Sequence, residues 1–315
     1  MNTPHATPVF VLGLQRSGTT LAANLLAAQP GIAAVAAEHH HGVHESVYFS
    51  HFSPAMEPWP GPGWRADAAG DFLRSEYYRL TGRSRQWGEV AAEASASPAE
   101  LFCRVMDDLA QRQGASVWVE KSPHHTLLAD RIAKAVPSAL FLCVSRASPG
   151  FLRSRLWSYG RCPPPYPRRA VLIGRACASN VFHRRCMQRL RRQLGKDRVF
   201  AADFEALRSD PGRALAPLLA AAGLPNAALR PPGYAPNSSF ASQSQRKQAL
   251  TATDLVTVKV SETLARAVPQ VLLSALQRRI ARRRPTMFPA WVWPASAAAP
   301  VRGSLPHGPL DGGGL

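Results

Sequence analysis

The sequence predicts an α/β fold, a domain of three layers in which a central parallel sheet is flanked by helices. Continuous apolar runs at 9–12, 117–119 and 140–144 suit strands that are buried on both faces of such a sheet. A helical pattern follows each run along the chain. The 315 residues, 46% of them hydrophobic, are enough for one sizeable core, so we expect a single domain over residues 1–284.

The first strand leads directly into a helix, which is indicated by leucines at helical spacing, Leu21, Leu25 and Leu26. Between strand and helix, Gly13 and Gly18 stand five positions apart, the glycine spacing of the phosphate-binding loop G-x-x-x-x-G-K-[ST]. Backbone N–H groups at a helix N-terminus attract an anion without needing any particular side chain. The stretch therefore indicates a P-loop-type fold.

One residue of this loop departs from the nucleotide triphosphatases. Thr19 stands where those enzymes keep the lysine that bridges the β- and γ-phosphates of ATP. Arg16 supplies a positive charge earlier in the loop. The loop is thus suited to phosphate but poorly suited to ATP with magnesium.

The formal net charge of +18 raises the question of a nucleic-acid partner. Much of the charge lies in two arginine-rich helical stretches, 184–192 and 278–284, and neither contains the aromatic residues that stack on bases. We therefore expect no specific nucleic-acid partner. For 278–284 we expect at most a weak contact with a polyanion or an anionic membrane.

The chain ends and the cysteines narrow the class of protein further. The N-terminal residues MNTPHATP lack the features of a signal peptide, and no window reaches the about 20 apolar residues of a membrane span. We expect a soluble, cytoplasmic protein. The five cysteines form no C-x-x-C pair, so neither a disulfide framework nor a zinc knuckle is indicated. Residues 285–315, rich in Pro, Ala and Gly, are predicted to be mostly disordered.

A second short strand at 32–35 leads into a stretch with one glutamate and several histidines: Glu38, His39, His40, His41, His44 and His51. Strand ends in open α/β sheets face the ligand crevice, so this stretch should lie beside the loop. Three consecutive histidines do not easily converge on one ion, and the pair His40 and His44 lacks the acid of an H-E-x-x-H motif. No metal site is predicted.

Loops are expected above the strand ends, beside the glycine loop. Residues 52–75 are rich in Pro, Gly and Trp, which is typical of an irregular excursion. We expect loops at about 40–95 and 155–185 to form a substrate pocket above the glycine loop. Between them, Ser97 as N-cap and Glu100 at the third helical position predict a helix over 98–113.

Two further strands end in charged residues. The run at 117 ends in Glu120 and Lys121, and the run at 140 ends in Ser145 and Arg146. A P-loop kinase would often place a metal-binding aspartate at such a strand end, whereas an arginine indicates a second anionic group. Ser154 follows Arg146 about two helical turns later and could face the same pocket.

The chain resembles the sulfotransferases that use 3′-phosphoadenosine 5′-phosphosulfate (PAPS), in particular bacterial members and the tyrosylprotein and carbohydrate branches. Four blocks between about residues 8 and 225 carry the resemblance, in order QRSGTTLAANLLAAQPGI, EKSPHH, FLCVSRASPGFLRSRLWS and, more weakly, VFAADFEALRSDPGRALAPLLAAAGLP. Two details differ from the family pattern. Ala147-Ser148-Pro149 replaces the common Asp-Pro-Arg or Asp-Gly-Arg, and Phe204-Glu205-Ala206-Leu207 replaces Tyr-Glu-Asp-Leu.

The resemblance implies which residues bind PAPS. The residues implied to hold the 5′-phosphosulfate are Arg16, Ser17, Gly18, Thr19 and Thr20. Arg146 and Ser154 are implied to hold the 3′-phosphate. A late loop with Asn237, Ser238 and Ser239 resembles one that covers the nucleotide in related enzymes, although these residues also suit a helix N-cap.

The resemblance also implies catalytic residues, with alternatives left open. Lys121 matches a family lysine that faces the transferred group, or else it forms a structural ion pair with Glu120 or Glu89. The acceptor hydroxyl must lose a proton, and Glu38 stands nearly where the tyrosylprotein branch carries its glutamate. His39 or His40 could replace it as the base. No metal is expected, because PAPS transfers its sulfuryl group without magnesium.

The sequence therefore predicts a PAPS-dependent sulfotransferase that acts on a hydroxyl of a carbohydrate, a tyrosine or a small molecule and releases 3′-phosphoadenosine 5′-phosphate (PAP). One alternative is a P-loop small-molecule kinase that uses ATP, against which Thr19 and the strand-end Arg146 argue. The other is a non-catalytic protein that binds polyanions on the same fold.

Overall fold

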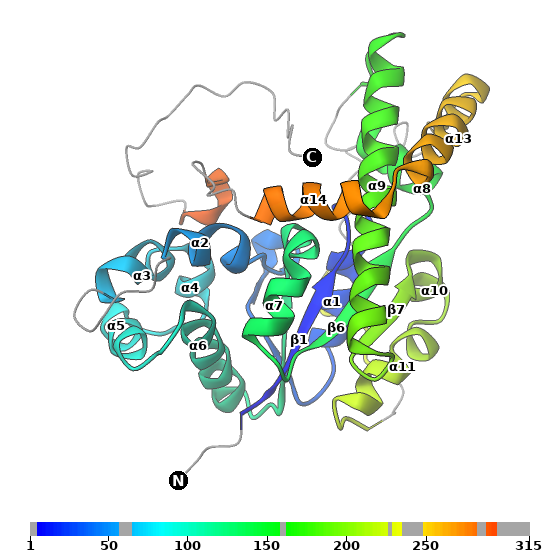
Figure 1. Cartoon of the computed structure of the whole chain (residues 1–315). Helices are drawn as coiled ribbons and strands as arrows, with labels where there is room; N and C mark the ends of the chain where they lie inside the picture. Colours follow the sequence, from blue (N-terminus) through cyan, green and yellow to red (C-terminus); the bar gives the residue numbers. More distant parts are fainter. Residues whose placement is uncertain are drawn as a thin grey trace.

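The computed structural model describes residues 5–56, 65–157, 162–225, 229–234, 248–281 and 288–294. Within these ranges the main sheet has five parallel strands in the order β2-β5-β1-β6-β7 (Figure 1). Their bounds are β1 Thr7–Leu12, β2 Ile32–Ala34, β5 Val117–Lys121, β6 Leu140–Ser145 and β7 Val199–Asp203. The expected α/β fold with a central parallel sheet is confirmed.

Strand β1 lies at the centre of the sheet, and its neighbours end at the same edge. Val11 is in register with Lys121 of β5, and Leu12 is in register with Cys143 of β6. Because the strands are parallel, the loop that follows β1 emerges between Lys121 on one side and the end of β6 on the other. The two charged strand ends thus flank the glycine loop.

Alternate residues of the central strands point to opposite faces of the sheet, and each face is covered by helices. Val9 and Val11 belong to a core shared with α1 (Thr19–Ala27) and α11 (Pro211–Ala221). Phe10 and Leu12 belong to the other core, with α6 (Pro98–Arg112), α7 (Ala129–Ala135) and the C-terminal part of α9 (Arg168–Leu194). These two cores make the three layers.

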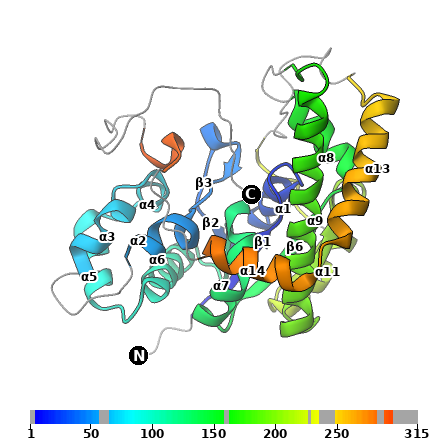
Figure 2. The same cartoon turned by 45° about the horizontal axis from the view of Figure 1, so that its top comes forward.

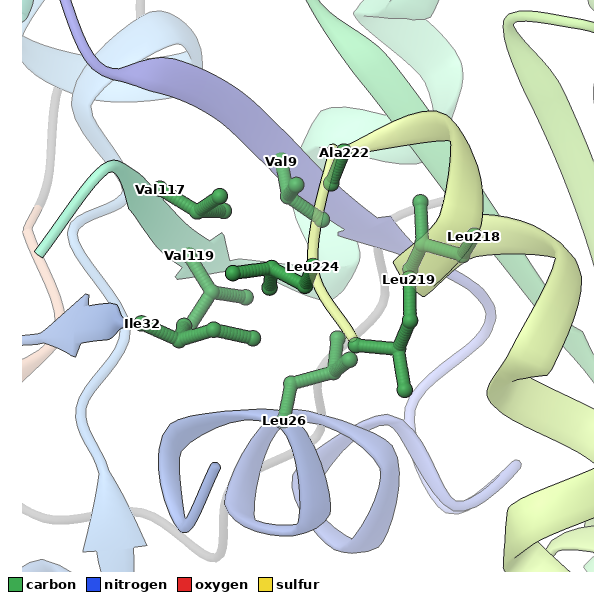
Figure 3. A pocket seen from close by; sticks show the side chains of 9 residues that line it. All are labelled: Val9, Leu26, Ile32, Val117, Val119, Leu218, Leu219, Ala222 and Leu224. Carbon is green, nitrogen blue, oxygen red and sulfur yellow. The ribbon is translucent and has the colours of Figure 1, made fainter. Parts of the chain in front are cut away.

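The contact between the sheet, α1 and α11 is entirely apolar. Figure 3 shows the side chains that meet there, Val9, Leu26, Ile32, Val117, Val119, Leu218, Leu219, Ala222 and Leu224. The space among them does not admit a water molecule. This region is therefore packed core that fixes α1 against β1, and it is not a ligand site.

The segment expected to form loops at 40–95 is largely helical where the structure describes it. A π-helical turn (Tyr48–Phe52) and a short helix α2 (Ser53–Ala55) precede α3 (Arg65–Leu73), α4 (Glu76–Leu80) and α5 (Arg85–Glu93). Phe72 and Tyr77 are buried against Phe102 of α6. The prediction of irregular chain over 52–75 is wrong for the described residues 53–55 and 65–73, which are helical because aromatic side chains such as Phe72 pack onto α6; residues 57–64 lie outside the described residues.

The second expected loop, at 155–185, is also mainly helix. Helix α8 runs over Ser148–Trp157, and α9 begins at Arg168 and continues well past residue 185. Figures 1 and 2 both show α13 (Ala252–Ala267) lying alongside α9. Buried Ile173 and Cys177 of α9 pack with Val258 of α13, so apolar contacts with the C-terminal helices sustain this long helix.

Local sequence signals explain several element boundaries. The Ser97 side chain accepts a hydrogen bond from the Glu100 amide, as the capping pattern predicted. The Glu100 side chain accepts one from the amide of Ala96 and not from that of Ser97, so the reciprocal half of the pattern is displaced by one residue. Two shorter helices begin in the same way, α4 at Ser75 and α10 (Phe204–Ser209) at Asp203.

Two C-terminal helices are separated at Pro269, with α13 ending at Ala267 and α14 spanning Gln270–Ala281. Arg278 and Arg279 are exposed on α14, while 282–284 lie outside the described residues, so the polyanion contact at 278–284 stays a prediction.

Residues 288–294 pack onto the domain, and the ring centre of Trp291 lies 5.5 Å from that of His44. In the described part of the chain, no helix combines the length and apolar character needed to cross a bilayer.

We expect stability to fall when the pH drops below about 6.5, because three histidines, two buried and one partly buried, resist protonation. Burial lowers the pKa of His44 to about 3 and those of His51 and His183 to about 4, from 6.5. Their contribution is complete above the unfolded value of 6.5 and is lost as the pH falls toward 4, since only the unfolded chain takes up protons there. Each histidine should remove about 1.4 kcal/mol of unfolding free energy per pH unit. Urea titrations at pH 7.5 and 5.5 measure this loss, and equal unfolding free energies would contradict it.

Candidate active site

The loop between β1 and α1 has the form of an anion site. Ser17 is buried, and its Oγ has no hydrogen-bond partner among the described residues. Gly18 caps α1 with φ of 102°, and a Cβ on it would lie 2.4 Å from the Phe204 ring. Glycine is therefore required here by both backbone angle and space. A helix N-terminus together with an unsatisfied hydroxyl is suited to binding a phosphate or sulfate oxygen.

The remaining loop threonines start the helix. Thr19 is buried and Thr20 is half-buried at the first two positions of α1. Neither brings a positive charge into the loop, as expected for an anion site that lacks the lysine of ATP-binding loops.

Thr126 anchors the start of the loop, which the sequence did not indicate. The Gly13 amide donates to Thr126 Oγ1 at 2.8 Å, and this hydroxyl donates to the Gly13 carbonyl at 3.0 Å. Thr126 lies on a 3-10 helix (Pro123–Leu128) after β5 and is 113 positions from Gly13. At such a separation, no local pattern could have revealed the pairing.

The residues predicted to bind a second anion lie beside the loop. Arg16 Nε donates to Ser154 Oγ of α8 at 3.1 Å, and Arg146 Nη1 donates to the Arg16 carbonyl at 3.4 Å. Arg146 directly follows β6, and Ser154 is buried. The three residues thus form one cluster at the end of the central strands.

The environment of the Arg146 guanidinium favours the binding of an anion. Its Nε is buried and has no hydrogen-bond partner in the part of the chain described here, and its Cζ lies 3.9 Å from the centre of the Phe204 ring. Burial lowers the pKa of Arg146; Glu205 partly offsets this, whereas Arg153 and Arg16 lower it further. Arginine remains charged in proteins, so several cations in one half-buried place favour binding of an anion.

Lys121 forms an ion pair, as one of the two alternatives held, but with a partner that the sequence did not indicate. Its Nζ lies 2.8 Å from Glu45 Oε1, and the lysine side chain is only 4% exposed. Neither expected partner is used, because Glu89 pairs with Arg85 and Glu120 accepts hydrogen bonds from other groups. Glu45 follows strand β4 (Gly42–Val43) and holds Lys121 at the edge of the sheet beside the loop.

Glu120 has a structural role. Its carboxylate is fully buried and accepts hydrogen bonds from Ser46, Ser122 and His125, and the Phe49 amide donates to the other ring nitrogen of His125. Burial alone would raise the pKa of Glu120, but His125 and the two serines hold it below its ordinary value. This network fastens the chain at 46–49 to the end of β5.

The predicted bases lie on a hairpin held by α1. Glu38 and His39 begin a 3-10 turn (Glu38–His40) between β3 (Ala36–Ala37) and β4, and both side chains are exposed. Asn24 of α1 donates to the His41 carbonyl at 2.8 Å and accepts from the Val43 amide at 2.9 Å. The helix that begins at the anion loop therefore also orients the turn with Glu38. Asn237, Ser238 and Ser239 lie outside the described residues.

Comparison with known proteins identifies the family. The model of the sulfotransferase family matches residues 8–228. No curated protein matches the chain. One similar solved structure is the sulfotransferase domain from the Synechococcus PCC 7002 olefin synthase, with 20% identity, a TM-score of 0.46 and coverage of 85% of this chain and 98% of that one. Another is a sulfotransferase from Alicyclobacillus acidocaldarius, with 16% identity, a TM-score of 0.42 and coverage of 89% and 100%. Since the family match spans more than half of the 315 residues, the protein belongs to the sulfotransferase family.

Proposed function

We propose that this sulfotransferase moves the sulfuryl group of PAPS to a hydroxyl acceptor and releases PAP. The observation that carries the proposal is the contact between two anion-binding elements. The loop with the unsatisfied Ser17 hydroxyl lies against Arg146, whose buried Nε also lacks a partner among the described residues. Two adjoining cationic places suit a nucleotide that has phosphates at both its 5′ and 3′ positions.

The residues of the two elements fit the two ends of such a nucleotide. The loop residues that would hold the 5′-phosphosulfate are Arg16, Ser17, Gly18, Thr19 and Thr20. Arg146 and Ser154 would hold the 3′-phosphate, and the Arg16–Ser154 hydrogen bond couples the two groups. When bound, PAPS supplies the sulfuryl group and a phosphate leaving group. Loop amides and Arg16 would stabilise the negative charge that grows on this phosphate.

Two further residues would act on the transfer itself. Lys121, fixed by Glu45 beside the loop, would face the transferred group and neutralise its negative oxygens. Glu38 would accept the proton of the acceptor hydroxyl, with His39 as the alternative base. Both lie on the hairpin that Asn24 attaches to α1, which supports a base near the loop.

The same features disfavour a kinase. The loop has Thr19 in place of the lysine that bridges the phosphates of ATP. Strand β6 is followed by Arg146, at a position where a P-loop kinase often has an aspartate that binds magnesium. An arginine at that strand end repels a metal ion and attracts a phosphate. The site is therefore better matched to transfer without magnesium.

Transfer of a labelled sulfuryl group tests the proposal. The protein is incubated with PAPS carrying ³⁵S and with separate panels of carbohydrates, tyrosine peptides and small hydroxyl compounds, and labelled products are identified by mass spectrometry. We expect labelled product from one panel together with an equal amount of PAP. PAP formed without any labelled product, or phosphate transfer from ATP in its place, would contradict the proposal.

Arg16→Asn should weaken PAP binding by about tenfold or more without lowering the melting temperature, because it removes a charged hydrogen-bond donor from the loop. Asparagine is the suitable replacement, since Arg16 has φ of 73° and asparagine tolerates this left-handed region. Calorimetric titration with PAP measures the affinity. If the ligand-free protein unfolds more easily while its folded fraction binds PAP normally, the role of Arg16 is structural and the assignment is wrong.

A further inference from the structure

A second cluster of potential ligands lies outside the nucleotide-binding loop. It consists of His39 and His40 on the 3-10 turn and Glu76 at the start of α4. Their ligand atoms all lie within 4.8 Å of one another. His39 Nε2 is 3.3 Å from Glu76 Oε1, and His40 Nε2 is 3.8 Å from the same oxygen. Two imidazoles and a carboxylate thus converge from two elements of the fold.

These separations are close to those of a tetrahedral metal site. With zinc bonds of about 2.05 Å to nitrogen and oxygen, neighbouring ligand atoms of a tetrahedron lie about 3.3 Å apart. The His39–Glu76 pair already has this spacing, and the His40–Glu76 pair exceeds it by half an ångström. The ligand atoms of the whole cluster lie within 4.8 Å of one another, so side-chain movements of up to about 1.5 Å would bring all three to bonding distance of one ion.

His40 has a ring nitrogen that is available to bind a metal ion. Its Nε2 is buried and makes no hydrogen bond within the described residues, since Glu76 at 3.8 Å is too distant. The ring stacks on His44 at 3.7 Å, and burial, with the neighbouring His39, lowers the pKa of His40. A neutral imidazole keeps a lone pair, which is the form that binds metal.

Glu76 completes the donor set. Hydrogen bonds from Arg79 lower the pKa of its carboxyl below the ordinary value, although burial opposes this, so the group is ionised at neutral pH. The Glu76 side chain is 5% exposed and that of His39 is 60% exposed. The cluster is thus walled by protein on one side and open to solvent on the other.

We propose that His39, His40 and Glu76 bind one divalent transition-metal ion of the zinc type, with a fourth position open to solvent. Imidazole and carboxylate ligands suit zinc and its neighbours better than magnesium. The ion would tie the turn that contains Glu38 to α4, and so to the group of helices α3 to α5, of which α5 packs against the outside of α6 (Figure 2). The site goes beyond the proposed transfer from PAPS and does not rest on it.

Three consecutive histidines, His39 to His41, do not converge on one ion, as the sequence indicates. Only His39 and His40 converge in the structure, because His41 takes φ of 57° and ends the turn. The carboxylate comes from a residue 37 positions after His39, which no local motif contains. His41 therefore provides a matched control, since it belongs to the same histidine run but not to the cluster.

The experiment titrates Co²⁺ into the ligand-free protein and records its visible absorption, with Zn²⁺ added afterwards as a competitor. We expect one Co²⁺ per chain, displaced by Zn²⁺ and not by Mg²⁺. Removing a residue that only hydrogen-bonds to a metal ligand lowers metal affinity by about 10- to 100-fold. Removing a ligand itself should lower it by at least as much, so we expect this loss in His39→Ala and in His40→Ala. Glu76→Gln should weaken binding to the same extent, and His41→Asn should leave it unchanged.

Three results would overturn the proposal. One is the absence of saturable binding, another is equal loss of affinity in His41→Asn and His39→Ala, and the third is binding that survives in His39→Ala. His39 is exposed, so its variant should fold, and melting temperatures verify this for all four variants. Because the readout is metal binding to the protein alone, it is independent of whether sulfuryl transfer is observed.

Discussion

Arg146→Ala is expected to abolish the preference of the protein for PAP over AMP. A hydrogen bond to a charged group contributes about 1.5–3 kcal/mol, which corresponds to about 10- to 150-fold in the dissociation constant of PAP. AMP, which lacks the 3′-phosphate, should bind the variant and the parent protein within a few-fold of each other. Calorimetric titration of both proteins with both nucleotides measures the effect.

Controls are needed because Arg146 also makes contacts within the protein. Its guanidinium lies on the Phe204 ring and donates to the Arg16 carbonyl, so truncation could disturb the loop. Arg146→Lys keeps the positive charge and should retain part of the preference for PAP, while ligand-free melting temperatures report on the fold. An unchanged PAP-to-AMP ratio in a folded Arg146→Ala variant would show that the 3′-phosphate binds elsewhere.

Glu38→Gln is expected to lower turnover by about a hundredfold or more while PAP affinity stays within a few-fold. A positioned general base contributes about 10²- to 10⁴-fold to a rate, and glutamine retains the shape of glutamate without its basicity. Glu38 is exposed on its turn, so the substitution should not affect folding. The initial rate of sulfuryl transfer at saturating PAPS measures the effect.

His39→Ala serves as the comparison for the base. His39 is adjacent in the same turn and is the alternative base, so a smaller loss in His39→Ala than in Glu38→Gln supports the assignment. Near-normal turnover in Glu38→Gln together with a large loss in His39→Ala would assign the proton transfer to the histidine. Both rates are measured without added metal and in the presence of a chelator, which separates them from the metal site proposed above.

The central layers of the fold were predictable because their signals are local. The buried strands β1, β5 and β6 are continuous apolar runs, and the start of α6 follows from Ser97 and Glu100. The helices α3 to α5 were missed for a physical reason. They are short, and their stability comes from packing aromatic side chains such as Phe72 onto α6, which local propensity does not reveal.

The site was predictable to the extent that strand ends define it. Parallel strands bring Lys121, the glycine loop and Arg146 to one edge, so the cluster of Arg16, Arg146 and Ser154 follows from topology. Contacts between distant residues were not predictable. The pairing of Lys121 with Glu45 spans 76 positions, and no sequence motif encodes it.

A comparison of two nucleotide affinities tests the central claim most directly, namely that the loop and Arg146 together hold a nucleotide with phosphates at both its 5′ and 3′ positions. One preparation of the protein is titrated by calorimetry with PAP and with ADP in the presence of Mg²⁺. The account predicts one PAP per chain, bound about tenfold or more tightly than ADP with Mg²⁺. Tighter binding of ADP with Mg²⁺ than of PAP would contradict it.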